Sequence, residues 1–249
     1  MIVCLFASCG PAAKNQVDPA LDSEMPQKML WAWERPEDLR FIDTNEFGVA
    51  FLAQTVTLTS DQVNVKRRRQ PLEVPDGTYL VAVTRIETVR NERQRPTYDD
   101  AMIRRTVEAI VTTLALPGVR GIQIDFDAVV SERSFYRRLM TALRVEMDSR
   151  AEGNARIPLT MTSLASWCTG DAWFNDFPVA EAVPMAFQMG ADADKLRAYL
   201  RNGKDWREPL CRGSYGISLE EGKLDGMRDG RRIYYFKNSA WRKDDLSVP

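Results

Sequence analysis

The sequence predicts an α/β protein with an irregular (β/α)8 barrel of the TIM type. Eight short apolar runs in the 249-residue chain are typical of β-strands. Most are continuously hydrophobic, as in parallel strands that are covered on both faces. Segments with helical periodicity separate several of them, as βαβ units require. Eight such strands fit a barrel of ~200 residues or more.

The expected strands follow one another from residue 28 to residue 238. They are residues 28–34, 48–56, 78–86, 119–126, 157–165, 181–189, 214–220 and 232–238.

Three segments between these strands are expected to be helices because their apolar residues recur every three or four positions. Residues 97–116 begin at Thr97 and residues 131–148 begin at Ser131, and both residue types cap helix N-termini. Residues 192–202 end before Gly203, a common C-terminal cap.

Two departures from a regular barrel are expected. Residues 57–77 contain no helical pattern and end in Pro-Asp-Gly, so an extended excursion with a turn replaces the helix between the second and third strands. Residues 239–249 leave little chain after the eighth strand, so the last helix is short or missing. Residues 29–249 are expected to form one barrel domain.

The N-terminus resembles the end of a bacterial lipoprotein signal. In residues 1–9, MIVCLFASC, an apolar run leads to small residues and a cysteine, so Cys9 is the expected lipid attachment site. Residues 10–28 are then a flexible tether. This interpretation predicts a lipid-anchored protein on the periplasmic side of the bacterial envelope, with the outer membrane favoured because Gly10 follows the cysteine. The alternative is a frayed hydrophobic N-terminus.

The cysteine count agrees with export. If Cys4 leaves with the signal and Cys9 carries lipid, Cys168 and Cys211 remain as an even pair in an oxidising compartment. A disulfide between them is expected, and two separate buried thiols are the alternative.

The composition excludes several kinds of chemistry. The chain has no histidine, which removes Ser-His-Asp and Cys-His catalysis and histidine-bound zinc. A net charge of -1 gives no general attraction to nucleic acid. The basic residues 66–69 could form an anion-binding patch, but a solvated loop is the simpler interpretation. No phosphate-binding loop or metal-ligand cluster is evident, so we expect no cofactor, no metal and a monomer.

Residues 119–128, VRGIQIDFDA, carry the most specific chemical signal. Strand alternation places Gln123, Asp125 and Asp127 on one face and the apolar residues on the other. In a barrel this polar row would end at the C-terminal mouth, where active sites are built. We expect the two carboxyl groups to lie close together there, with at least one raised pKa. The alternatives are a structural polar network or a cation site.

The segment GIQIDFD resembles the fourth-strand motif of the glycoside hydrolase family 18 chitinases. By position, Asp125 matches the last motif aspartate and Asp127 matches the catalytic acid, which is a glutamate in that family. Gln123 and Arg120 replace two further motif aspartates. The resemblance implies a glycosidase-like barrel, and the departures leave acid catalysis open.

Most of residues 29–220 resembles a bacterial family described as domain of unknown function 3142. The motifs, in chain order, are WAWERPEDLRFID, GVAFLAQTVTL, GIQIDFDA, SERSFYRRLM, LASWCTGD and EAVPMAFQMG. This resemblance implies a barrel related to glycosidases but no established substrate or catalytic residue.

Other strand ends offer aromatic and polar side chains that could stack on sugars or bond to hydroxyl groups. The candidate substrate-binding residues are Gln123, Trp33, Glu34, Gln54, Glu87, Trp167, Gln188, Glu220 and Asn238. Trp33 and Trp167 could equally be core residues, and Glu87 could form a salt bridge with Arg85.

These observations predict an envelope protein whose partner is a glycan or oligosaccharide. The first hypothesis is a glycoside hydrolase with Asp127 as acid and Asp125 as its electrostatic partner. The second is a carbohydrate-binding protein of the same fold without catalysis, and the third is a structural envelope protein.

Overall fold

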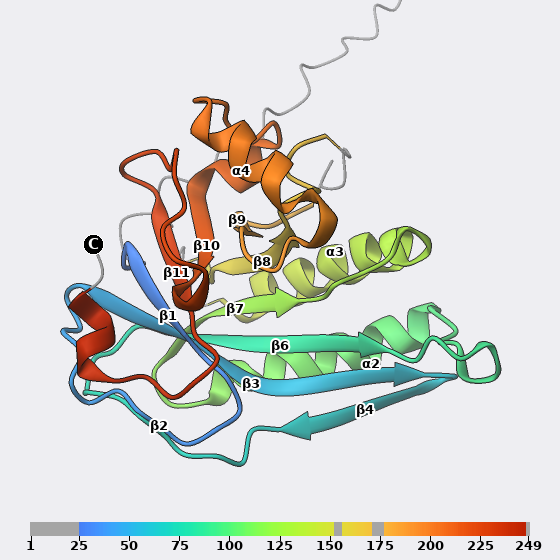
Figure 1. Cartoon of the computed structure of the whole chain (residues 1–249). Helices are drawn as coiled ribbons and strands as arrows, with labels where there is room; N and C mark the ends of the chain where they lie inside the picture. Colours follow the sequence, from blue (N-terminus) through green and yellow to red (C-terminus); the bar gives the residue numbers. More distant parts are fainter. Residues whose placement is uncertain (1–24, 152–155, 171–176, 248–249) are drawn as a thin grey trace, which may run out of the picture.

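Eight parallel strands close into a barrel in the computed structural model, which describes residues 25–151, 156–170 and 177–247 (Figure 1). Each strand pairs with the next, and the first pairs with both the second and the last, which closes the ring. The predicted fold class is therefore confirmed. The barrel strands are β1 (Lys28–Ala32), β3 (Phe47–Thr59), β6 (Leu80–Thr88), β7 (Val119–Asp125), β8 (Leu159–Leu164), β9 (Glu181–Met185), β10 (Ser214–Ser218) and β11 (Arg232–Phe236).

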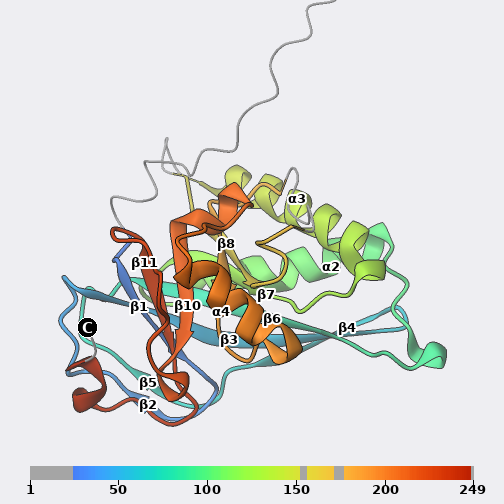
Figure 2. The same ribbon diagram turned by 45° about the horizontal axis from the view of Figure 1, so that its top comes forward.

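Three α-helices cover part of the barrel in the described residues. They are α2 (Asp100–Val111), α3 (Arg133–Arg150) and α4 (Ala193–Arg201), and they follow β6, β7 and β9. The apolar faces expected from the sequence are buried, including Val107 on α2 and Leu139 on α3. α2 and α3 run side by side along the same side of the barrel (Figures 1 and 2).

The predicted cap of the first helix is wrong. Asp99 caps α2, and its carboxylate accepts a hydrogen bond of 2.7 Å from the backbone N–H of Met102. Tyr98 has a φ of 54°, a left-handed conformation that a right-handed helix cannot continue through. A helix starting at Thr97 is therefore interrupted, and α2 begins at Asp100.

A hairpin replaces the helix between the second and third barrel strands, as the extended excursion predicted. β4 (Gln62–Arg67) pairs antiparallel with the far half of β3, and β5 (Leu72–Glu73) pairs with β2 (Glu37–Asp38). The hairpin extends β3 to Thr59, beyond the predicted end. The Pro-Asp-Gly turn is confirmed: Gly77 has a φ of 81°, and the next N–H bonds back to the carbonyl of Pro75.

The chain after β11 forms a short 3-10 helix, Lys243–Ser247, as the brief C-terminal segment predicted. This segment lies beside β1 and β2 (Figure 1). The indole N–H of Trp241 donates a 2.9 Å hydrogen bond to the carbonyl of Trp31 in β1. The C-terminal segment therefore covers a part of the barrel wall that a helix would cover in a regular barrel.

The core has two layers. One layer lies between the strands and the helices, and the other fills the barrel itself with residues such as Met29, Trp31 and Val183. Towards its N-terminal end the interior holds an ion pair, in which Arg232 lies 3.0 Å from Glu181. Tyr234 donates a second bond of 2.7 Å to the same carboxylate.

The predicted signal, residues 1–9 with Cys9, lies outside the described residues, as does most of the predicted tether. The last part of that tether is packed on the barrel: Met25 is buried, and the carbonyl of Pro26 accepts a 2.9 Å bond from Arg232. The predicted tether is therefore wrong for residues 25–28. None of the helices in the described ranges is long and apolar enough to cross a membrane.

Candidate functional site

β7 places its polar row inside the barrel, as strand alternation predicted. Gln123 is fully buried, and its side-chain amide donates a 3.1 Å bond to Thr160 on β8. Asp125 ends the strand one level higher. The chain then turns tightly, because the N–H of Ala128 bonds to the carbonyl of Phe126 at 2.8 Å. This turn presents Asp127 at the mouth.

A cavity of about 430 Å³ lies at this C-terminal mouth, and both aspartates line it. The cavity is within the usual size of ligand pockets, ~300–1,000 Å³. Its walls combine aromatic, aliphatic and polar residues from seven barrel strands or the residues that follow them, and from α4. The lining residues are Trp33, Arg85, Asp125, Asp127, Leu164, Ala165, Ser166, Met185, Phe187, Gln188, Met189, Gly190, Asp192, Leu196, Ser218, Phe236 and Asn238.

Asp125 is a buried carboxyl group with few partners. Its side chain is almost inaccessible, with the residue 6% exposed. Thr162 donates a 2.7 Å hydrogen bond to Oδ1, and a guanidinium nitrogen of Arg85 lies 3.8 Å from Oδ2. Burial, together with the negative charge of Asp127, raises the pKa of Asp125 to about 6, although Thr162 and Arg85 act in the opposite direction. This carboxyl group can therefore exchange a proton near neutral pH.

Asp127 is more accessible and reaches the solvent. The protein atoms packed around its carboxyl group raise its pKa, while Arg85 and Arg90 counteract that rise. Two carboxyl groups with raised pKa values in one pocket form an interacting pair. The expected placement of both carboxyl groups at the mouth is thus observed, and the raised pKa of Asp125 agrees with the expectation, whereas their role stays a prediction.

Tyr136 on α3 is a neighbour of this pair that the sequence interpretation missed. Its ring meets Phe126 edge to face, with centroids 5.1 Å apart. The pKa of its hydroxyl is raised by burial and by the charges of Asp125 and Asp127. That hydroxyl has no hydrogen-bond partner in the described part of the chain. Helix periodicity does not indicate which residues lie near the aspartates, so the sequence contains no signal for this position.

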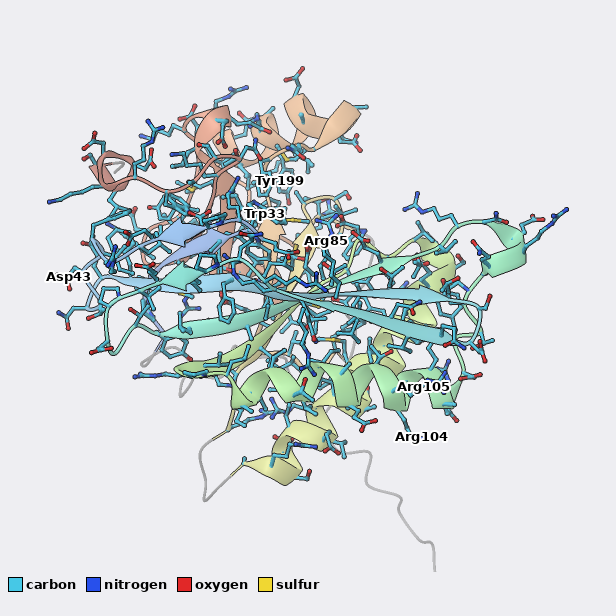
Figure 3. All side chains as sticks on the ribbon, turned by 90° about the horizontal axis from the view of Figure 1, so that it is seen from below. Trp33, Asp43, Arg85, Arg104, Arg105 and Tyr199 are labelled. Carbon is cyan, nitrogen blue, oxygen red and sulfur yellow. A yellow bond between two sulfur atoms is a disulfide. The ribbon has the colours of Figure 1, made fainter. Side chains whose placement is uncertain are left out.

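Aromatic rings form one wall of the pocket. Trp33 follows β1, Phe236 ends β11 and Phe187 follows β9. The centroids of Phe187 and Phe236 are 4.6 Å apart, and Phe236 stacks on Trp31 at the same distance. Trp33 lies beside Arg85 (Figure 3), whose guanidinium is 5.9 Å from the ring centroid. Such rings can stack on the apolar faces of sugars.

Two half-buried arginines hold the loops that carry this wall. The guanidinium of Arg68 donates 2.6 Å bonds to the carbonyls of Trp33 and Arg35. Arg35 in turn donates to the carbonyls of Lys237 and Asn238 and to the carboxylate of Glu37. The simple interpretation of residues 66–69 as a solvated loop is therefore wrong for Arg68, because its side chain fixes the loop that carries Trp33.

The structure brings several predicted binding residues together. Trp33, Gln188 and Asn238 line the pocket with the two aspartates. Glu87 lines an adjoining charged cleft of about 310 Å³. It also forms a salt bridge of 3.2 Å with Arg85, which was the expected alternative to a binding role.

Other predicted residues lie near the mouth but do not line its main pocket. Gln123 is buried one level below Asp125. Glu34 pairs with Lys66 at 3.3 Å. Glu220 accepts 2.8 Å and 2.7 Å bonds from the N–H of Asn238 and the hydroxyl of Ser218, so it positions two residues that do line the pocket.

Two predicted residues lie elsewhere. Gln54 is on the outer face of the barrel, where its amide bonds to Thr84 and, at 3.0 Å, to the carbonyl of Ala109 on α2. Trp167 is buried in the outer core layer. Neither lines the pocket, so both leave the candidate set.

The predicted disulfide between Cys168 and Cys211 is confirmed, with Cα atoms 5.9 Å apart. It joins the loop that follows β8 to the turn that precedes β10, and both strands supply residues to the pocket. Among the described residues, no group of three or more His, Cys, Asp or Glu side chains could hold a metal ion.

No protein-family model, curated protein or solved structure matches this chain. The fold and the site define an irregular TIM-like barrel with two carboxyl groups in an aromatic pocket at its C-terminal mouth.

Proposed function

We propose that the mouth pocket binds a saccharide and that the Asp125–Asp127 pair supplies the proton for hydrolysis of a glycosidic bond. The observation that carries the proposal is the placement of both carboxyl groups, each with a raised pKa, in a pocket walled by Trp33, Phe187 and Phe236. Glycoside hydrolysis needs a protonated carboxyl group next to the leaving oxygen, and sugar binding needs aromatic faces with polar groups around them.

The accessible carboxyl group is assigned the acid role. Asp127 protonates the leaving oxygen as the glycosidic C–O bond breaks, a water molecule adds its hydroxyl to the anomeric carbon, and the remaining proton restores the carboxyl group. Asp125 lies deeper and bears the bond from Thr162. In the proposal it shares one proton with Asp127, because two close carboxylates resist joint ionisation.

The neighbouring arginine favours a second candidate function. Arg85 lies 3.8 Å from Asp125 and also lowers the pKa of Asp127. A cation in this position stabilises the charged forms, which suits carboxylates that accept hydrogen bonds from sugar hydroxyls without transferring a proton. A non-catalytic carbohydrate-binding protein is therefore the alternative.

Hydrolysis and binding assays with a panel of chromogenic glycosides and oligosaccharides separate the two candidates. For a hydrolase, Asp127→Asn should lower kcat by roughly 10²-fold or more while leaving the binding of the same glycan largely intact. Wild-type activity should fall as the pH rises through about 6, the pKa of Asp125, because the carboxyl pair then loses the proton that it donates.

The control is Glu108→Gln, which removes an exposed carboxylate on α2. It should leave activity unchanged. Binding without turnover would favour the carbohydrate-binding alternative, and a chain that neither binds nor cleaves any member of the panel would overturn the proposal.

An envelope location, with Cys9 as lipid anchor, belongs to the same proposal. The disulfide supports export, because such bonds persist mainly in oxidising compartments.

A further inference from the structure

A second cavity, on the outer face of the barrel, has three arginines in its wall. It encloses about 360 Å³ between the β3–β4 hairpin and the chain that follows α2. Arg67, Arg68 and Arg69 line it, and no carboxylate does. Its apolar wall includes Phe51 and Leu116. Its volume is within the range of small-molecule sites.

Strand geometry explains why two of these arginines face the cavity. Arg67 lies directly opposite Gln54 in the β3–β4 ladder, so their side chains share one face of the hairpin. Gln54 points outward, to the carbonyl of Ala109 on α2. Arg69 follows two residues after Arg67 and also lines the cavity. The hairpin occupies the place of the missing helix, and a helix lying flat on the strands would fill this space.

The charge in the cavity wall is not neutralised by the protein. Arg67 and Arg69 are exposed, and their side chains form no hydrogen bond or ion pair within the described residues. Arg68 is held by backbone carbonyls and forms no ion pair within the described residues, although Glu37 and Glu34 are near enough to act on its charge. Lys66, in the same basic run, differs in pairing with Glu34 at 3.3 Å. An anion is the ligand that three such charges favour.

The apolar wall defines the rest of the ligand. Phe51 is 6% exposed and Leu116 is 40% exposed, so the cavity runs from the barrel wall to an aliphatic residue in contact with solvent. A small inorganic ion would leave this apolar surface wet, whereas a hydrocarbon group would cover it.

We propose that this cavity binds a small amphipathic anion, a carboxylate or phosphate monoester joined to an apolar body. Arg67 and Arg69 bond to the anionic group, Arg68 adds its fixed charge, and Phe51 and Leu116 contact the apolar part. The site is separate from the mouth pocket and does not depend on the function proposed there.

Calorimetric titration of the full chain with octanoate and with octyl phosphate tests the proposal and distinguishes the two anionic groups. At least one of the two should bind. Acetate and inorganic phosphate, which lack the apolar body, should bind roughly tenfold more weakly or worse. Octyltrimethylammonium, which has the same chain and the opposite charge, should not bind.

The double variant Arg67→Gln/Arg69→Gln should weaken binding at least tenfold, because charge-assisted hydrogen bonds are lost. The matched control Arg104→Gln/Arg201→Gln removes two exposed charges from α2 and α4 and should bind like the wild type. The variant Leu116→Asn should weaken only the probes that carry an octyl chain.

Three results would overturn the proposal. They are no binding of either octyl anion, equal weakening in the test and control double variants, and acetate or phosphate binding as tightly as its octyl counterpart. Melting temperatures recorded for every variant ensure that folded proteins are compared, and Leu116→Asn keeps the test valid if the double variant unfolds.

Discussion

Replacing Asp125 by Asn is expected to stabilise the fold at neutral pH. The pKa of Asp125 rises from its ordinary value of 3.8 to about 6 in the folded protein, because burial and the charge of Asp127 penalise ionisation. Between these two values the folded chain binds more protons than the unfolded chain. The free energy of unfolding therefore falls as the pH rises through this window. Asparagine has no charge to bury and removes this penalty.

The expected gain follows from the same two values. A tenfold change in an ionisation equilibrium is worth about 1.4 kcal/mol, so the difference between 3.8 and about 6 corresponds to about 3 kcal/mol at pH 8. The carbonyl oxygen of asparagine can still accept the bond from Thr162. Arg85 loses an ion pair at 3.8 Å, which is worth little because its side chain is 36% exposed. A gain of about 2 to 3 kcal/mol is therefore expected.

Urea unfolding followed by tryptophan fluorescence at pH 8, 6 and 3.5 measures this gain. The advantage of Asp125→Asn over the wild type should be largest at pH 8 and close to zero at pH 3.5, where the aspartate is mostly protonated in both states. The exposed control Asp225→Asn should change the free energy of unfolding by less than about 0.5 kcal/mol at each pH. A variant that is less stable than the wild type at pH 8, or a difference that does not change with pH, would refute the reasoning.

Two further predictions concern the stability of the fold. The double variant Cys168→Ser/Cys211→Ser should lower the free energy of unfolding by about 4 kcal/mol. The disulfide closes a loop with a sequence separation of 43, and opening it raises the entropy of the unfolded chain. A loss below about 1 kcal/mol in urea unfolding would contradict this. Gly226→Ala should destabilise the protein more than Gly230→Ala in the same assay. Both glycines have a positive φ, but a Cβ at Gly226 would lie 2.2 Å from the carbonyl oxygen of Leu200, whereas a Cβ at Gly230 would have no atom within 4 Å. Equal losses would exclude the steric explanation.

The sequence predicted the strands and the polar row because these features depend on neighbouring residues. A strand buried on both faces needs a continuous apolar run, and strand alternation fixes which face a side chain joins. Asp125 and Gln123 therefore lie inside the barrel as predicted. The helix pattern was equally local, although the start of α2 depended on the left-handed conformation of Tyr98, which no periodicity shows.

Two predicted binding residues, Gln54 and Trp167, were misplaced because strand alternation does not show bulges or turns. The ladder between β3 and β6 shifts register between Leu52 and Gln54, and such a bulge inverts the faces of all later residues in the strand. Gln54 therefore points outward. Trp167 follows the end of β8, in a turn where its N–H bonds to the carbonyl of Leu164, and the turn directs its side chain into the outer core.

The pocket wall also depends on contacts between residues that are distant in sequence. Arg35 holds the loop that carries Asn238, 203 positions further along the chain. Arg68, which directly follows β4, fixes the chain at Trp33, 35 positions earlier. A basic run in a loop is usually solvated, and its sequence does not distinguish Arg68 from its two neighbours. The tertiary fold determines that Arg68 alone meets these carbonyls.

The hydrogen bonding of the buried carboxylates supports a binding role for Asp125 over a purely structural one. Glu181 accepts bonds from Arg232 and Tyr234, one at each carboxylate oxygen. Glu37 and Glu132 likewise have both oxygens bonded to protein groups.

A buried carboxylate with a structural role is expected to be satisfied in this way, since each unpaired oxygen costs desolvation free energy. Asp125 differs, because Thr162 bonds to one oxygen and, within the described residues, the other accepts no hydrogen bond. The residue also lines the mouth cavity, so a ligand in that cavity could supply the missing donor. A polar network built for stability alone would have satisfied this oxygen from the protein, as it does for the three glutamates.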